Sequence, residues 1–75
     1  MKISIEEITQ LQDGQGVNFN IGDGNMAEVW FKNNTYFLFE MTAMREHPMF
    51  VGAYSAYSHP EIAANQIVET VNSWT

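Results

Sequence analysis

The sequence predicts an α+β fold: a small antiparallel β-sheet of three to four strands, arranged as a meander, with a short N-terminal helix and a longer C-terminal helix packed on one face (α-β-β-β-β-α). The strands are indicated between Gly16 and Met41, where apolar-rich runs are separated by Gly22-Asp23-Gly24-Asn25 and by Asn33-Asn34. Such punctuation is typical of consecutive hairpins. The helices are indicated by a capping signal near each end of the chain.

The first helix is predicted to begin after Ser4. Ser4 and Glu7 have the spacing of a capping box, and Ile3 and Ile8 occupy the two positions of a hydrophobic staple. The apolar stripe comprises Ile5, Ile8 and Leu11. Asp13-Gly14 supplies the stop, because glycine readily adopts the left-handed conformation after a last turn. A helix of about two turns is not stable alone, so it should pack on the sheet.

The first strand is indicated by Val17, Phe19 and Ile21, which alternate with Asn18 and Asn20. Alternation of this kind is typical of a strand with one buried and one polar face.

The next two strands are predicted at 26–31 and 35–41, joined by Asn33-Asn34, whose side chains tolerate positive φ. A two-residue loop there pairs three sets of residues across the hairpin: Phe31 with Tyr36, Trp30 with Phe37, and Val29 with Leu38. Continuing this register through an Asp23-Gly24 turn places Ile21 opposite Met26.

This register sorts the side chains onto two faces. The expected core face comprises Phe19, Ile21, Met26, Trp30, Phe37 and Phe39. The expected outer face comprises Val29, Phe31, Tyr36 and Leu38 beside Asn18, Asn20 and Glu40. A three-residue turn in place of a two-residue turn would shift one strand by one position and disrupt this sorting.

A fourth strand is expected within 49–57, although Gly52 and the alanines weaken it. Ser58 and Glu61 form a second capping box, and Pro60 is tolerated in a first helical turn. His59 falls in this cap region. The stripe of the C-terminal helix comprises Ala63, Ala64, Ile67, Val68, Val71 and Trp74. This stripe should cover the core face of the sheet.

The composition indicates one domain spanning residues 1–75 that folds without disulfides, because the chain has no cysteine. The start of the chain lacks the long apolar run of a signal peptide or membrane anchor, so we expect a cytoplasmic protein that does not bind membranes. Nine acidic residues against three basic ones give a net charge of −6. That charge repels phosphates and disfavours direct nucleic-acid binding.

No motif in the sequence indicates catalysis, a cofactor or a metal site. Glu6 and Glu7 point about 100° apart on a helix. His47 and His59 do not have the spacing of zinc ligands. The glycine-rich segments lack the Lys and Ser or Thr of a phosphate-binding loop, so they are interpreted as turns. We therefore expect a protein that is not an enzyme and needs no cofactor.

The main functional hypothesis is a small acidic protein-interaction module. The apolar outer face exceeds what the helices are expected to cover, and such patches usually bind another protein. The partner would be a different protein or a second copy, giving a homodimer. The predicted partner-binding residues are Val29, Phe31, Tyr36, Leu38, Met44 and Arg45, the last two from the loop at 42–48. The competing interpretation is that the first helix folds over this face.

The sequence leaves two alternatives open. Glu28, which falls on the expected core face, could form a small-ligand site with Trp30 and His47. The protein could also be an acidic inhibitor or accessory factor of the kind that phages and mobile elements encode, mimicking nucleic acid. Mimicry would require one continuous negative stripe made by Glu6, Glu7, Asp13, Glu61 and Glu69.

Overall fold

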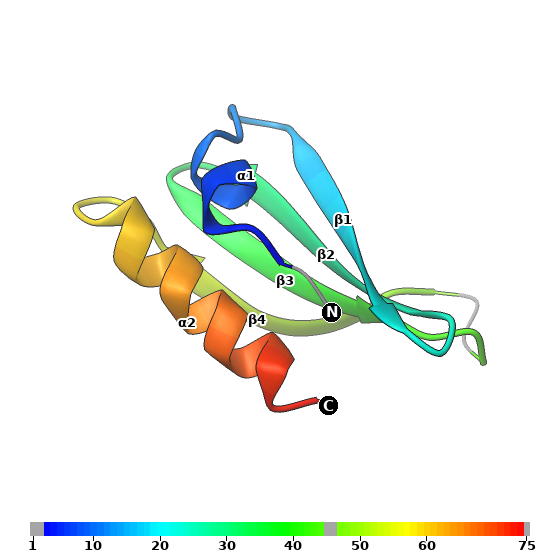
Figure 1. The fold of residues 1–75 in the computed structure, drawn as a ribbon. Helices are drawn as coiled ribbons and strands as arrows, with labels where there is room; N and C mark the ends of the chain where they lie inside the picture. The colour runs from blue at the N-terminus through cyan, green and yellow to red at the C-terminus, as the bar shows by residue number, and fades with distance from the viewer. Residues whose placement is uncertain (1–2, 45–46, 75) are drawn as a thin grey trace.

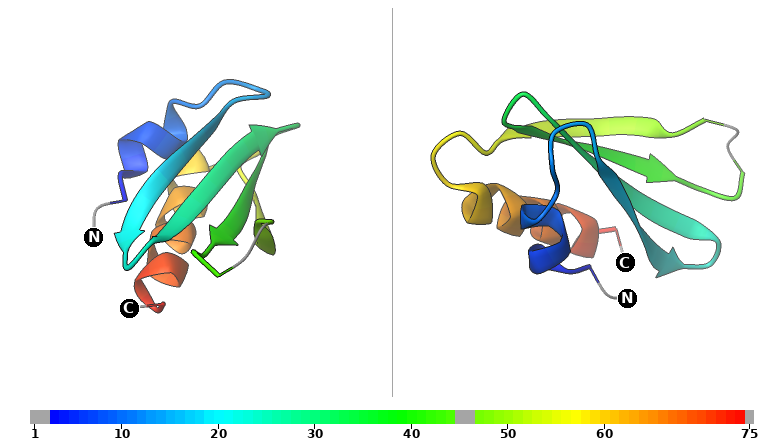
Figure 2. Two further views of the ribbon diagram at one scale, coloured as in Figure 1. Left: turned by 90° about the vertical axis from the view of Figure 1, so that its right-hand side faces the viewer. Right: turned by 90° about the horizontal axis from the view of Figure 1, so that it is seen from above.

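The computed structural model describes residues 3–44 and 47–74 and has the predicted α+β architecture (Figure 1). Its elements in chain order are α1 (Ile5–Thr9), β1 (Gly16–Gly22), β2 (Asn25–Lys32), β3 (Thr35–Met41), β4 (Met49–Ser55) and α2 (Pro60–Asn72). The strands form one antiparallel meander in the order β1-β2-β3-β4. Both helices lie on the same face of the sheet, where α1 packs beside α2 (Figure 2). None of the helices described here is long and apolar enough to cross a membrane.

The β2–β3 hairpin has the predicted two-residue turn. Asn33 and Asn34 both have positive φ, at 53° and 56°, which is the backbone of a type I′ turn. The pairing of Phe31 with Tyr36 and of Trp30 with Phe37 is confirmed. The local turn chemistry therefore set the register of the two central strands correctly.

The β1–β2 hairpin differs from the prediction by one residue. Gly22 pairs with Asn25, but the next pair is Asn20 with Met26, so Ile21 is an extra residue in a β-bulge. Gly22 adopts a φ of 97°, which an L-residue rarely tolerates, and its N–H donates to the Asn20 side-chain oxygen at 2.9 Å. The predicted pairing of Ile21 with Met26 is therefore wrong.

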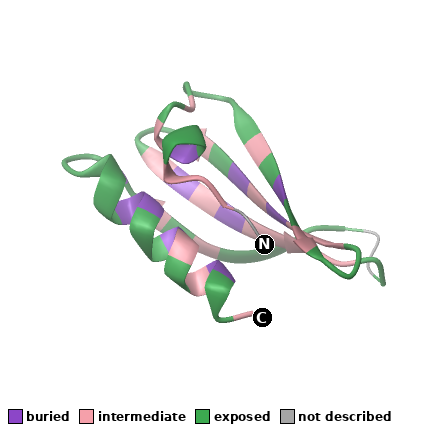
Figure 3. Ribbon diagram, viewed as in Figure 1, coloured by how far each residue is buried: buried purple, intermediate pink, exposed green. Residues whose placement is uncertain are grey.

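The bulge reverses the predicted assignment of faces. It pairs Phe19 with Ala27 and Val17 with Val29, so the apolar side of β1 lies on the same face as Val29 and Leu38. The helices cover that face, and buried residues alternate with less buried ones along the strands beneath them (Figure 3). The core consists of Ile8, Phe19, Ala27, Val29, Tyr36, Leu38, Ala56, Ala63, Ala64, Ile67 and Val71. The expected core positions Met26, Trp30, Phe37 and Phe39 lie on the opposite face.

The two helix starts show one correct and one wrong cap prediction. Ser4 caps α1, where its hydroxyl accepts a hydrogen bond from the Glu7 N–H at 3.2 Å. The N-cap of α2 is His59 and not Ser58, and the His59 side chain makes no capping hydrogen bond. Pro60 explains the difference, because proline prefers the first helical position and so makes the preceding residue the cap.

Candidate functional site

The most prominent surface feature is the sheet face that carries no helix, which we call the open face. Its apolar residues are Met26, Trp30, Phe37, Phe39, Met41 and Phe50. Trp30 and Phe50 remain 42% and 56% exposed, which is high for such large apolar side chains. The Phe39 and Phe50 rings meet edge to face, with centroids 5.7 Å apart. The open face is therefore a continuous aromatic surface in contact with solvent.

This surface exists because β2 and β3 carry large apolar side chains on both sides of the strand. Val29 and Leu38 point toward the helices and are fully buried, whereas their neighbours Trp30 and Phe37 point away from them. A second bulge in β4, at Val51, leaves that side chain 36% exposed beside Phe50. Both helices pack on one face of the sheet, so the apolar side chains of the other face are not covered by any described helix.

Charge is distributed unevenly around the sheet. Among the acidic residues that the structure describes, only Glu28 belongs to the open face by register, opposite Phe39. The other described acids lie in the helices, in the connecting turns or on the face of Ala27, and they are Glu6, Glu7, Asp13, Asp23, Glu40, Glu61 and Glu69. Lys32, the one basic residue within the described part of the chain, also lies on the open side of β2. The open face is thus close to neutral on a molecule whose net charge is −6.

The predicted partner-binding residues occupy different environments from those expected. Val29, Tyr36 and Leu38 are at most 1% exposed, and Phe31 is half-buried with its ring centroid 4.8 Å from that of Tyr36. Burial also raises the pKa of the Tyr36 phenol from its ordinary value of 10.0. The expected exposure of these side chains is wrong, because the β1 bulge puts the apolar side of β1 on their face of the sheet, which is the face that the helices cover. Met44 is exposed in the β3–β4 loop, and Arg45 lies outside the described residues.

The structure does not assemble the small-ligand site predicted from Glu28, Trp30 and His47. Glu28 and Trp30 share the open face of β2, but His47 follows the end of β3, at the opposite end of the sheet from Trp30. Within residues 3–44 and 47–74, no group of three His, Cys, Asp or Glu side chains could hold a metal ion.

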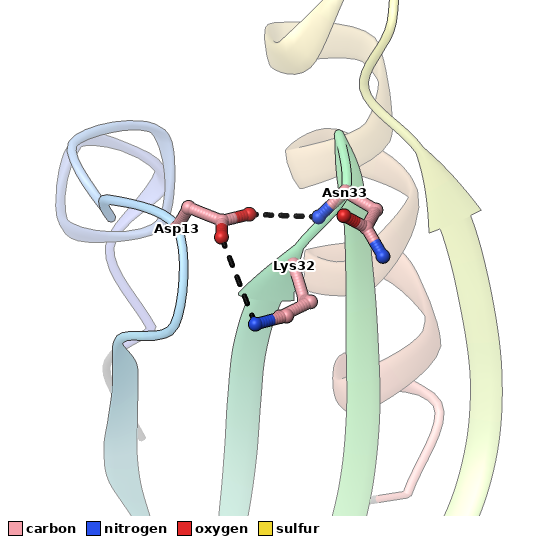
Figure 4. A network of polar contacts seen from close by, with 3 residues as sticks. All are labelled: Asp13, Lys32 and Asn33. Atoms are coloured by element: carbon pink, nitrogen blue, oxygen red, sulfur yellow. Dashed lines mark hydrogen bonds and ion pairs between the residues drawn. The ribbon is translucent and has the colours of Figure 1, made fainter.

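Asp13 is one of the five acidic residues that nucleic-acid mimicry would require in a continuous negative stripe, and its carboxylate is already engaged. One Asp13 oxygen accepts a hydrogen bond from the Asn33 N–H at 2.8 Å, and the other lies 3.9 Å from the Lys32 ammonium (Figure 4). This carboxylate therefore ties the α1–β1 loop to the β2–β3 turn and is partly compensated by a cation. Its position gives no specific support to nucleic-acid mimicry.

A hollow of about 500 Å³ lies where α1, the α1–β1 loop and β1 meet the edge of Trp30. Its wall consists of Glu7, Gln10, Leu11, Gly14, Gln15, Gly16, Val17 and Trp30. The hollow is wide open to solvent and combines apolar side chains with one carboxylate and two carboxamides. Sequence reasoning missed it, because its wall is assembled from segments whose contact depends on the path of the α1–β1 loop.

Comparison of the chain with known protein families, curated protein sequences and solved structures gives no significant match. The open face and the hollow are therefore the two structural features that bear on function.

Proposed function

We propose that this protein is a non-catalytic interaction module that associates with a second copy of itself through the open face. The observation that carries the proposal is the aromatic surface on the uncovered side of the sheet, where Trp30 and Phe50 are exposed and Phe37 and Phe39 are partly buried. Contiguous apolar patches of this kind on small proteins usually contact another protein. Aromatic residues also dominate the energetics of such interfaces.

The charge distribution favours a second copy as the partner. Two chains that each carry a net charge of −6 repel one another unless their acidic surfaces stay apart. Face-to-face packing of the open faces places α1 and α2, with Glu6, Glu7, Glu61 and Glu69, on the outside of the pair. The acidic helices would then be separated by the thickness of two sheets, and the contact would bring together two nearly neutral surfaces.

The size of the face indicates a weak complex. Strands of seven to eight residues, spaced about 4.8 Å apart, give a projected area of about 450 Å². Two copies together would bury roughly 900 Å², which is below the roughly 1,200–2,000 Å² of stable specific interfaces and within the range of weak, transient ones. We expect a dissociation constant on the order of tens of micromolar. Two sheets stacked in this way lie about 10 Å apart, with their strands within about 30° of each other.

Single-stranded nucleic acid is a less suitable partner, although exposed aromatic rings can stack on bases. The open face offers one described ammonium, that of Lys32, and this group lies beside Asp13. Nucleic-acid binding depends on several cations that neutralise phosphates. The same charge balance that suits a second copy therefore opposes an oligonucleotide.

Sedimentation equilibrium over a range of protein concentrations tests the proposal. The wild type should show a monomer–dimer equilibrium that strengthens when salt screens the like net charges. Phe50→Ser and Phe39→Ser should each weaken association at least tenfold, because each removes a large apolar contact from the face. Ile62→Ser is the matched control, since Ile62 is 55% exposed on α2, on the helix side of the molecule. It should leave the equilibrium unchanged.

Circular dichroism of each variant checks that it is folded, so that lost association is not confused with unfolding. A wild type that remains monomeric at about 1 mM overturns the proposal, because that concentration is far above the expected dissociation constant. Dimerisation that Ile62→Ser abolishes and Phe50→Ser preserves also overturns it. Binding of a single-stranded oligonucleotide at moderate salt would assign the face to a different partner.

A further inference from the structure

The hollow beside Trp30 has a shape that depends on Gly16. Gly16 and Trp30 are cross-strand partners, and the indole lies directly over the glycine backbone. A Cβ added at Gly16 would fall 2.6 Å from the indole ring, closer than any real contact. The missing side chain thus lets the indole lie flat at the edge of β1, where it forms one wall of the hollow.

The opposite wall is held rigidly by backbone hydrogen bonds. The Gly14 N–H donates to the Phe31 carbonyl at 2.7 Å, and the Phe31 N–H donates to the Gln15 carbonyl at 2.9 Å. The side-chain oxygen of Gln15 accepts from the Gln12 N–H at 2.8 Å. Asp13 adds its contacts to Lys32 and Asn33 (Figure 4). The α1–β1 loop is therefore fastened to the end of β2 before any ligand arrives, which lowers the entropic cost of binding.

The chemistry of the wall suits a cation. Glu7 contributes a carboxylate, Gln10 and Gln15 contribute carboxamides, and Trp30 contributes an indole. Within the described chain, no basic residue lines this wall. The Lys32 ammonium lies against Asp13, outside the set of lining residues. An aromatic face attracts cations through its quadrupole, and indole does so most strongly. The net charge of −6 adds a general attraction for positive ligands.

We propose that this hollow binds a basic side chain, preferably arginine, presented by a peptide segment of another molecule. The guanidinium stacks on the Trp30 indole and faces the Glu7 carboxylate. Arginine is favoured over lysine because its flat guanidinium stacks on aromatic rings and is less strongly hydrated than an ammonium. Trp30 belongs to both this hollow and the open face, but arginine binding does not require self-association and self-association does not require arginine.

Titration with two isosteric probes tests the site. N-acetyl-arginine amide carries the guanidinium, whereas N-acetyl-citrulline amide has nearly the same shape without the charge. Binding is followed by the NMR shifts of the Trp30 indole N–H and of the Gly14 and Gly16 amides, at a protein concentration below that of dimerisation. We expect saturable, millimolar binding of the arginine probe that is at least about fivefold tighter than that of the citrulline probe.

Two variants and one control assign the contacts. Glu7→Gln keeps the shape of the side chain and removes its charge, so it should weaken the arginine probe about fivefold and leave the citrulline probe unchanged. Gly16→Ala should displace the indole and weaken binding further. Glu61→Gln is the control, because it removes a carboxylate from the first turn of α2, away from the hollow. It should have no effect.

Equal binding of the two probes, or no saturable binding of either, overturns the proposal. An unchanged affinity in Glu7→Gln, with loss in Glu61→Gln, would also overturn it, because the attraction would then come from α2. Loss of dimerisation in Phe50→Ser with retained arginine binding would separate the two sites. A neutral monosaccharide that binds in place of the arginine probe would assign the hollow to a different ligand class.

Discussion

Tyr36 links the buried face to a measurable pH dependence. Burial raises the pKa of its phenol above 10.0, because the charged phenolate is poorly solvated inside the protein. The unfolded chain therefore loses this proton at a lower pH than the folded chain does. Below about pH 10 the phenol is neutral in both states, and burial of Tyr36 contributes fully to the free energy of unfolding. As the pH rises through the raised pKa of the folded state, this stabilisation is lost.

Urea unfolding at several pH values checks this expectation. The wild type should lose stability above about pH 10 more steeply than Tyr36→Phe, which cannot ionise at this position. Tyr57, which is 80% exposed, supplies the control, and Tyr57→Phe should retain the wild-type slope. Identical slopes in the wild type and Tyr36→Phe would mean that the Tyr36 ring is not enclosed beneath the helices.

At the scale of single elements, a substitution in the β2–β3 turn should increase the stability of the protein. Asn34 adopts a φ of 56°, and glycine occupies this conformation without the strain that a Cβ causes. Asn-Gly is also the preferred pair for a type I′ turn. Asn34→Gly should raise the free energy of unfolding by about 0.5 kcal/mol, measured by denaturant titration. A loss of stability would contradict the type I′ assignment, and with it the register of β2 and β3.

A second prediction concerns the N-cap of α2. His59 is the N-cap and offers no capping hydrogen bond, whereas serine at the N-cap accepts a hydrogen bond from the second or third helical N–H. His59→Ser should therefore stabilise the protein by about 0.5–1 kcal/mol in thermal unfolding. Ser58→Ala should change stability little, because Ser58 precedes the cap. The reverse pattern would place the helix start one residue earlier.

Local signals in the sequence were sufficient to predict most elements. The Ser4 cap, the Asn33-Asn34 turn and the apolar stripe of α2 each depend on neighbours within a few residues, and all three are confirmed. The bulge at Ile21 was not predictable in the same way. A glycine beside an Asp-Gly turn is compatible with either a regular or a bulged hairpin, so the sequence pattern alone did not distinguish between them.

That single residue determined how the candidate site was assigned. The excess of apolar side chains in the sheet was visible in the sequence, but the register placed the exposed set on the wrong face. Because side chains alternate with a period of two, a shift of one position in β1 changes which side of β2 and β3 lies with the apolar residues of β1. The hollow beside Trp30 was not accessible to this reasoning, since it depends on contacts between α1, its loop and β1.

At the scale of the whole molecule, neighbouring residues on β3 distinguish the two faces. Leu38 is fully buried between the sheet and the helices, whereas Phe37 lies on the open face. Leu38→Ala should cost about 2–5 kcal/mol, a large fraction of the roughly 4–11 kcal/mol expected for a chain of this length. Phe37→Ala should cost clearly less in the same denaturant titration. Equal losses would contradict the placement of the helices on one face.

Self-association through the open face is tested most directly by an NMR dilution series on protein labelled at its methionine and isoleucine methyl groups. Met26 and Met41 pair across the open face, whereas Ile62 is exposed on α2. If the open face binds a second copy, the Met26 and Met41 methyl shifts should change with concentration up to about 1 mM while that of Ile62 stays constant. Concentration-dependent shifts at Ile62 alone, or constant shifts at all three methyls, would contradict self-association through the open face.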